Sequence, residues 1–99
     1  MKFDHIALNV KSIHTSVQWY RENMKATVEY EDQTWAMLKI GETKIALTIE
    51  GDHPPHVAFQ VSDFSEFPEG CEIKQHRDGS WYYYDRDLSG NVIEWIKYD

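Results

Sequence analysis

Two histidines occupy matching places in a six-residue pattern that occurs twice in the 99-residue chain. His5 opens the pattern at residues 5–10, HIALNV, and His56 opens it again at residues 56–61, HVAFQV, 51 positions later. Apolar and other side chains alternate in both copies, which is typical of a half-buried strand. If the strictly apolar positions pack under a helix, His5 faces the opposite side of the sheet, and His56 does the same.

Glu94 supplies a carboxylate at a matching place in the last strand of the second copy. Residues 93–95, IEW, correspond to residues 45–47, IAL, so that the glutamate stands where the first copy has an alanine. If the two copies pair around a local two-fold axis, His5, His56 and Glu94 converge on one concave face. Two imidazoles and one carboxylate with open positions suit one divalent metal ion, for which we expect manganese, iron, zinc or nickel.

The other histidines and the cysteine are expected to have structural or surface roles. A single histidine on a strand is more often a hydrogen-bonded structural residue than a ligand, and only the repetition favours metal binding at the first pair. His14, His53 and His76 fall on a helix, in a linker and near a turn, and we expect them on the surface. Cys71 is the single cysteine, which excludes an internal disulfide and indicates a small core residue.

A helix is expected directly after the first histidine strand. Ile13, Val17, Tyr20 and Met24 recur at spacings of four, three and four residues, which places them on one helix face. Ser12 precedes them and can cap the first turn. In the second copy, proline and glycine leave room for about one helical turn between residues 62 and 70.

The order of elements predicts an α+β fold of paired βαβββ modules, the second with a shortened helix. The repeat, with its offset near 50 residues, indicates one supersecondary unit present twice. We expect a single domain of residues 1–99, with module one at 1–50, a linker at 51–55 and module two at 56–99. The expected strands are residues 5–10, 28–31, 35–40, 43–50, 56–61, 71–75, 81–86 and 91–98.

Four short segments together resemble a known superfamily. Residues 3–10, FDHIALNV, look like its first strand, 16–20, SVQWY, like its first helix, 56–59, HVAF, like the strand opening its second module, and 87–94, DLSGNVIE, like its closing turn and metal-binding glutamate. The chain resembles the vicinal oxygen chelate superfamily, which includes glyoxalase I, extradiol dioxygenases, fosfomycin-resistance thiol transferases and bleomycin-resistance proteins. The resemblance implies a glyoxalase/bleomycin-resistance/dioxygenase-like fold and metal ligands at His5, His56 and Glu94.

Departures from the superfamily pattern favour some of its members over others. Glyoxalase I-like members usually place a fourth, acidic ligand where this chain has Ala46, which disfavours that isomerase. The three-ligand pattern is more similar to the fosfomycin-resistance enzymes, and residues 74–80 are similar to their substrate loop. Those enzymes carry a hydroxyl two residues after the first histidine, where this chain has Ala7, and this argues against fosfomycin as the substrate.

Composition excludes several classes of protein. Ten Lys plus Arg against 17 Asp plus Glu give a net charge of −7, which argues against nucleic-acid binding. No apolar run approaches the roughly 20 residues of a membrane helix, and no leader pattern is recognised, so we expect a cytoplasmic protein without membrane association. Hydrophobic residues make up 41% of the chain, enough for a folded core.

Two classes of function fit this pattern. The first is a metal-dependent enzyme of the lyase, thiol-transferase or dioxygenase type, in which an ion chelates a small substrate through neighbouring oxygens. The alternative is a metal-free protein of the bleomycin-resistance type, which sequesters a drug-like ligand in an aromatic cleft. The expected substrate-binding residues are Tyr82, Tyr84, Trp35 and Thr48, with Tyr83 replacing its neighbours if a bulge reverses the strand parity.

A homodimer is expected, with each metal site shared between two chains. One βαβββ unit is an incomplete curved sheet that must close against a second unit. The linker at residues 51–55 is short and contains two prolines, which favours units that find their concave partner on another subunit. In that arrangement His5 comes from one chain and His56 and Glu94 come from the other.

Overall fold

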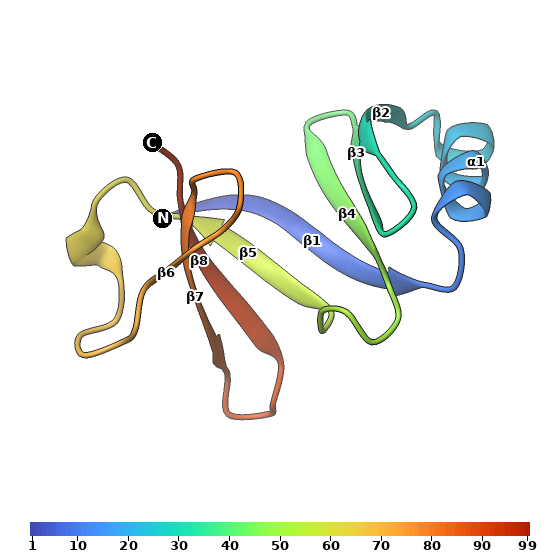
Figure 1. Ribbon diagram of the computed structural model, residues 1–99. Helices are drawn as coiled ribbons and strands as arrows, with labels where there is room; N and C mark the ends of the chain where they lie inside the picture. The colour runs from blue at the N-terminus through green and yellow to red at the C-terminus, as the bar shows by residue number, and fades with distance from the viewer. The chain divides into compact units, whose positions relative to one another are not determined.

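The computed structural model describes residues 1–99 and contains eight strands, one α-helix and one short 3-10 helix (Figure 1). In chain order these are β1 (Lys2–Val10), α1 (Ile13–Met24), β2 (Thr27–Glu31), β3 (Trp35–Ile40), β4 (Thr43–Ile49), β5 (His56–Gln60), η1 (Phe64–Glu66), β6 (Lys74–Gln75), β7 (Trp81–Arg86) and β8 (Val92–Lys97). The predicted α+β fold of two βαβββ modules is confirmed, with η1 as the shortened second helix. Neither helix has the length and apolar character needed to cross a membrane.

The chain forms two compact units. The first unit comprises His5–Pro55, and the second unit comprises Met1–Asp4 together with His56–Asp99. Strand β1 therefore begins in the second unit and continues into the first. The strand order is β2-β3-β4-β1 in the first unit and β5-β8-β7-β6 in the second.

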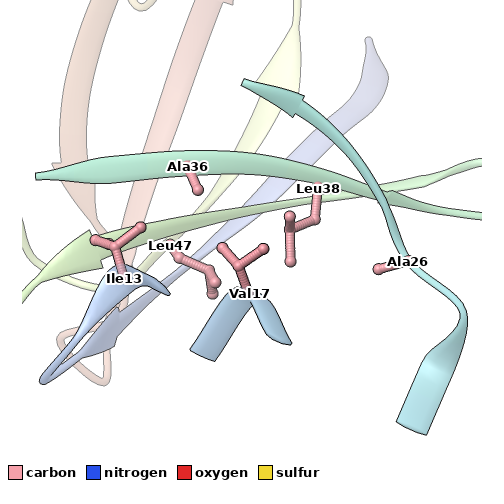
Figure 2. Close-up of a cluster of buried hydrophobic side chains, with 6 residues drawn as sticks. All are labelled: Ile13, Val17, Ala26, Ala36, Leu38 and Leu47. Carbon is pink, nitrogen blue, oxygen red and sulfur yellow. The ribbon is translucent and has the colours of Figure 1, made fainter. Parts of the chain in front are cut away.

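The core of the first unit lies between α1 and the sheet. Ile13 and Val17 point from the helix toward Ala36, Leu38 and Leu47 on β3 and β4 (Figure 2). Leu8 and Val10 of β1 pack against this cluster, as their alternation predicts. Burying these apolar side chains is what holds the helix on the sheet.

Both ends of α1 are defined by local hydrogen bonds. Ser12 caps the first turn as predicted, and its hydroxyl accepts a hydrogen bond from the backbone N–H of Thr15. Lys25 adopts a left-handed conformation with φ 55°, and the next N–H, that of Ala26, donates to the carbonyl of Tyr20. Of the four residues expected on one helix face, Met24 does not reach the core and is 45% exposed. Ala26, which follows the left-handed Lys25, is buried in the core instead.

The short 3-10 helix takes the place of α1 in the second unit. Asp63 and Glu66 form a capping box around it, and Phe67 follows in extended conformation. Phe64 lies edge-on to Trp81, with ring centroids 5.7 Å apart, and the ammonium of Lys97 lies 4.8 Å from its ring centre. A few aromatic contacts therefore replace the helix that packs on the first unit's sheet.

The register of the strands repeats from one unit to the other. Strands β1 and β4 are parallel and pair Ala7 with Ala46, whereas β5 and β8 are parallel and pair Ala58 with Glu94. The equivalence of Ala46 and Glu94 that the sequence indicated is thus present in the pairing itself. The predicted strand at residues 71–75 is shorter than expected, since only Lys74–Gln75 pairs with β7.

Replacing Leu38 by alanine should lower the free energy of unfolding by about 2–5 kcal/mol, because the side chain is fully buried under α1. Met24→Ala is the matched control, since 45% of that residue is exposed, and it should change the free energy by less than about 1 kcal/mol. Urea unfolding followed by circular dichroism measures both values. Equal effects of the two substitutions would contradict the assignment of the core.

Candidate metal centre

Glu94 is the most deeply buried charged side chain of the second unit. It lies in the middle of β8, where burial alternates along the strand, and only 1% of the residue is exposed. Its carboxylate lies between two imidazoles: Oε1 is 3.3 Å from Nε2 of His56, and Oε2 is 2.8 Å from Nε2 of His76. A carboxylate taken out of water is stable only with such partners.

Strand β5 places His56 next to this carboxylate. His56 is the first residue of the strand, directly after two prolines, and it is buried. It shares a strand face with Ala58, the residue that pairs with Glu94 across the parallel ladder. The predicted neighbours His56 and Glu94 are therefore in contact within one unit.

His76 is a member of this cluster that the sequence analysis missed. The expectation that it is a surface residue is wrong, because its ring stacks on Tyr82 with centroids 3.7 Å apart and contacts the buried Glu94. Lys74 pairs with Tyr82 across the hairpin, so that His76, two residues later, falls on the same face as the tyrosine. That register is the signal that could have identified it, but the register depends on where the short β6 begins.

The parity of the aromatic strand β7 is resolved by its pairing with β8. Tyr84 pairs directly with Glu94, and its ring lies 5.2 Å from the ring centres of both His56 and Tyr82. Tyr83 points to the other face, toward Trp95. Tyr82 and Tyr84 are thus the tyrosines on the carboxylate's face, and their contact with a substrate remains a prediction.

His5 lies at the start of the first unit and is buried, with 7% exposed. It shares its strand face with Ala7, the residue paired with Ala46. The preceding residue, Asp4, belongs to the second unit, where its carboxylate accepts a 2.7 Å hydrogen bond from the hydroxyl of Tyr98. The joining of His5 to the histidine and glutamate of the second unit stays a prediction.

The other predicted substrate contacts lie together in the first unit. Trp35 and Thr48 are opposite each other on β3 and β4. The ring of Tyr30 stacks on Trp35 with centroids 4.6 Å apart, and the Thr48 hydroxyl accepts a 2.8 Å hydrogen bond from the side-chain amide of Asn9. Both side chains are held by contacts within the first unit, and their role in substrate binding stays a prediction.

The donor set of the second unit fits a divalent ion. Two ligand atoms at about 2.0–2.2 Å from one ion, with an angle of about 90–110° between them, lie about 2.8–3.6 Å apart. The 3.3 Å between Nε2 of His56 and Oε1 of Glu94 falls in this range. Imidazole nitrogen with carboxylate oxygen is a combination that manganese, iron, nickel and zinc all accept.

The phenol of Tyr84 should ionise later than a tyrosine in water. Burial raises its pKa first, and the negative charge of Glu94 raises it further. The folded pKa therefore lies above the unfolded value of about 10, so that the stability linked to this proton is present below pH 10 and lost as pH rises through the folded pKa. Absorbance at 295 nm follows the ionisation of tyrosines. The titration step that the parent shows and Tyr84→Phe lacks should lie above pH 10 in native protein and at about pH 10 in urea. A step at about pH 10 in native protein would contradict the burial of Tyr84 beside Glu94.

Comparisons with known proteins assign the family. The model of the Glyoxalase/Bleomycin resistance protein/Dioxygenase superfamily matches residues 2–76, a range that includes both histidines of the repeat. Metallothiol transferase FosB of Staphylococcus epidermidis is 29% identical over 111 aligned residues, which cover 92% of this chain and 78% of the relative. Metallothiol transferase FosB of Staphylococcus haemolyticus is 26% identical over 99 residues, and here the chain spans 63% of the relative's length.

Solved structures share the fold at low sequence identity. Methylmalonyl-CoA epimerase from Mycobacterium tuberculosis superposes with a TM-score of 0.79 at 16% identity, covering 99% of this chain and 88% of the epimerase. A hypothetical protein from Bacillus halodurans superposes with a TM-score of 0.78 at 20% identity, covering 99% and 94%. The repeated module, the strand register and the family match agree: the chain belongs to the glyoxalase/bleomycin resistance protein/dioxygenase superfamily.

Proposed function

We propose that this protein is a divalent-metal-dependent enzyme that acts on a small substrate with neighbouring oxygen atoms. The observation that carries the proposal is the buried carboxylate of Glu94, 1% exposed, with the imidazole of His56 3.3 Å from one of its oxygens. Because the folded strands already place a carboxylate oxygen next to an imidazole nitrogen, a metal ion can bind both atoms without a change in the strands. We propose His56 and Glu94 as two of the ligands.

His5 is the proposed third ligand. It occupies in β1 the place that His56 occupies in β5, and it is buried in the same way. One peptide bond separates it from Asp4, whose carboxylate is bonded to Tyr98 in the second unit.

Transfer of a thiol group is the reaction type that the comparisons favour among those open to the family. Both curated relatives named above are metallothiol transferases, and Ala46 leaves the first unit without a fourth acidic ligand. When bound, the ion would stabilise negative charge developing on a substrate oxygen. A tyrosine is protonated at neutral pH, and burial beside Glu94 raises the pKa of Tyr84 further. We propose that its hydroxyl donates a hydrogen bond to that oxygen.

The remaining substrate contacts are proposed from the predicted set. Tyr82 presents its ring on the same face as Tyr84, and Trp35 and Thr48 would approach the substrate from the first unit. We place the reaction in the cytoplasm, where an unpaired thiol such as that of Cys71 stays reduced. The metal-free alternative is less favoured, because binding a cationic drug between aromatic rings does not require two imidazoles on a buried carboxylate.

Metal titration tests the proposal directly. Metal-free protein should bind one equivalent of Mn²⁺, Ni²⁺ or Zn²⁺ with a Kd below about 0.1 mM, and His56→Ala and Glu94→Gln should each weaken binding by at least about 100-fold. Isothermal titration calorimetry measures these constants. His53→Ala is the control, since this histidine is exposed in the linker and should bind metal like the parent.

The same variants separate an enzyme from a binding protein. A metal-dependent transferase should consume a small thiol in the presence of an electrophilic co-substrate, and a chelator should stop the reaction. Parent protein that binds no metal more tightly than about millimolar, or Glu94→Gln protein that binds as well as the parent, would refute the proposed ligands.

We also propose that the protein is a homodimer whose metal sites combine His5 of one chain with His56 and Glu94 of the other. The linker Gly51 to Pro55 is short and exposed, and it contains Pro54 and Pro55. Such a stiff connection favours exchange of the two units between subunits over closure within one chain.

Subunit mixing tests this arrangement. His5→Ala and Glu94→Ala proteins should each bind little metal, but a heterodimer of the two places both lesions in one site and leaves the other intact. A fully exchanged equimolar mixture, in which about half of the dimers are heterodimers, should therefore regain about a quarter of the parent's metal capacity. A monomer in sedimentation, or no recovery after verified subunit exchange, would show that each chain closes its own site.

A further inference from the structure

We propose that His76 is a positioning residue, which holds one oxygen of the Glu94 carboxylate so that the other oxygen faces His56 and a bound metal ion. The inference rests on the proposed function, because it assigns a role at the same centre. It adds a residue that lies outside the three predicted ligands. Three independent features of the structure restrain this side chain: its turn, its stacking partner and its hydrogen bond.

The turn that carries His76 is closed by its own backbone. The N–H of His76 donates to the carbonyl of Ser80 at 2.8 Å, and its carbonyl accepts from the N–H of Gly79 at 3.0 Å. Asp78 tightens the turn, because its carboxylate accepts hydrogen bonds from both the N–H and the hydroxyl of Ser80. Gly79 has φ 94°, a conformation that other residues rarely adopt. The backbone of His76 is thereby fixed at the end of the β6–β7 hairpin.

The ring of His76 is restrained by Tyr82. The two rings are nearly parallel, with centroids 3.7 Å apart and planes 14° apart. Tyr82 also contacts Tyr84 edge-on, and Tyr84 contacts His56 in the same way. This row of rings limits rotation of the imidazole and directs Nε2 toward β8.

The two oxygens of the Glu94 carboxylate have different partners. Oε2 of Glu94 lies 2.8 Å from Nε2 of His76, and Oε1 lies 3.3 Å from Nε2 of His56. A carboxylate only accepts, so His76 must donate from Nε2. With Oε2 held in this way, the carboxylate cannot rotate freely, and Oε1 is presented to the ligand position. Residues that orient a ligand by hydrogen bonding typically change metal affinity by about 10–100-fold when they are replaced.

The hydrogen bond and the aromatic contact can be separated by substitution. His76→Phe keeps a ring for stacking on Tyr82 but removes the donor, whereas His76→Gln loses the ring and keeps an N–H₂ donor at similar reach. We expect Mn²⁺ or Ni²⁺ affinity to fall about 10–100-fold in His76→Phe and to stay within about threefold of the parent in His76→Gln. His53→Phe, the same change in the exposed linker, should leave affinity unchanged. Thermal unfolding of the metal-free variants checks that each one folds.

A spectroscopic readout distinguishes positioning from ligation. With Co²⁺ bound, the visible absorption bands of His76→Phe and the parent should agree at saturation, because no ligand has been exchanged. Parent-like affinity in His76→Phe would overturn the inference. Altered Co²⁺ bands in His76→Phe, together with weak metal binding in His76→Gln, would also overturn the inference, because this result would make His76 a ligand.

A measurement without metal keeps this inference separate from the proposed function. Long-range ¹H–¹⁵N NMR spectra of metal-free protein at one neutral pH should show a proton on Nε2 of His76 engaged in a hydrogen bond, and Glu94→Ala should abolish that bond. If the parent binds no metal but this bond is found, the proposed function fails while the positioning contact stands. If Nε2 carries no bonded proton, the positioning role is wrong whatever the metal titration gives.

Discussion

The cost of removing the Glu94 carboxylate from water governs the second unit of this protein. A glutamate with 1% exposure in the centre of a strand would destabilise the fold unless both of its oxygens found partners. His56 from β5 and His76 from the β6–β7 hairpin provide those partners. Strands β5 and β8 and the β6–β7 hairpin thus contact one another at this buried carboxylate. The candidate metal centre therefore also contributes to the packing of the second unit.

The two modules show how a repeated scaffold can carry unequal functions. Ala7 pairs with Ala46 in the first unit, and Ala58 pairs with Glu94 in the second, so that equivalent positions hold a methyl group in one copy and a carboxylate in the other. The first unit has a three-turn helix on its sheet, and the second has only a capped 3-10 turn. The helix-covered core is therefore a feature of the first unit, and the buried carboxylate is a feature of the second.

Aromatic residues connect the carboxylate to its surroundings. Tyr84 stands opposite Glu94 on the adjacent strand and keeps its proton because burial and the neighbouring charge both oppose ionisation. Tyr82 stacks on His76 and touches Tyr84, which joins the hairpin to the centre of the sheet. A neutral hydroxyl beside a buried carboxylate and two imidazoles gives this face donors and acceptors of different kinds within a small volume.

Patterns in the sequence determined the modules, the cap at Ser12, and the equivalence of His5 with His56 and of Ala46 with Glu94. Period-two alternation depends only on neighbouring residues, and the repeat is found by comparing two segments of the chain, so neither needs the tertiary structure. The tertiary structure decided what the alternation alone left open. The end of α1 exposed Met24 and buried Ala26, since a left-handed residue reverses the chain there. The place of His76 was decided by the register of a two-residue strand and the closure of its turn, long-range pairings that no local pattern specifies.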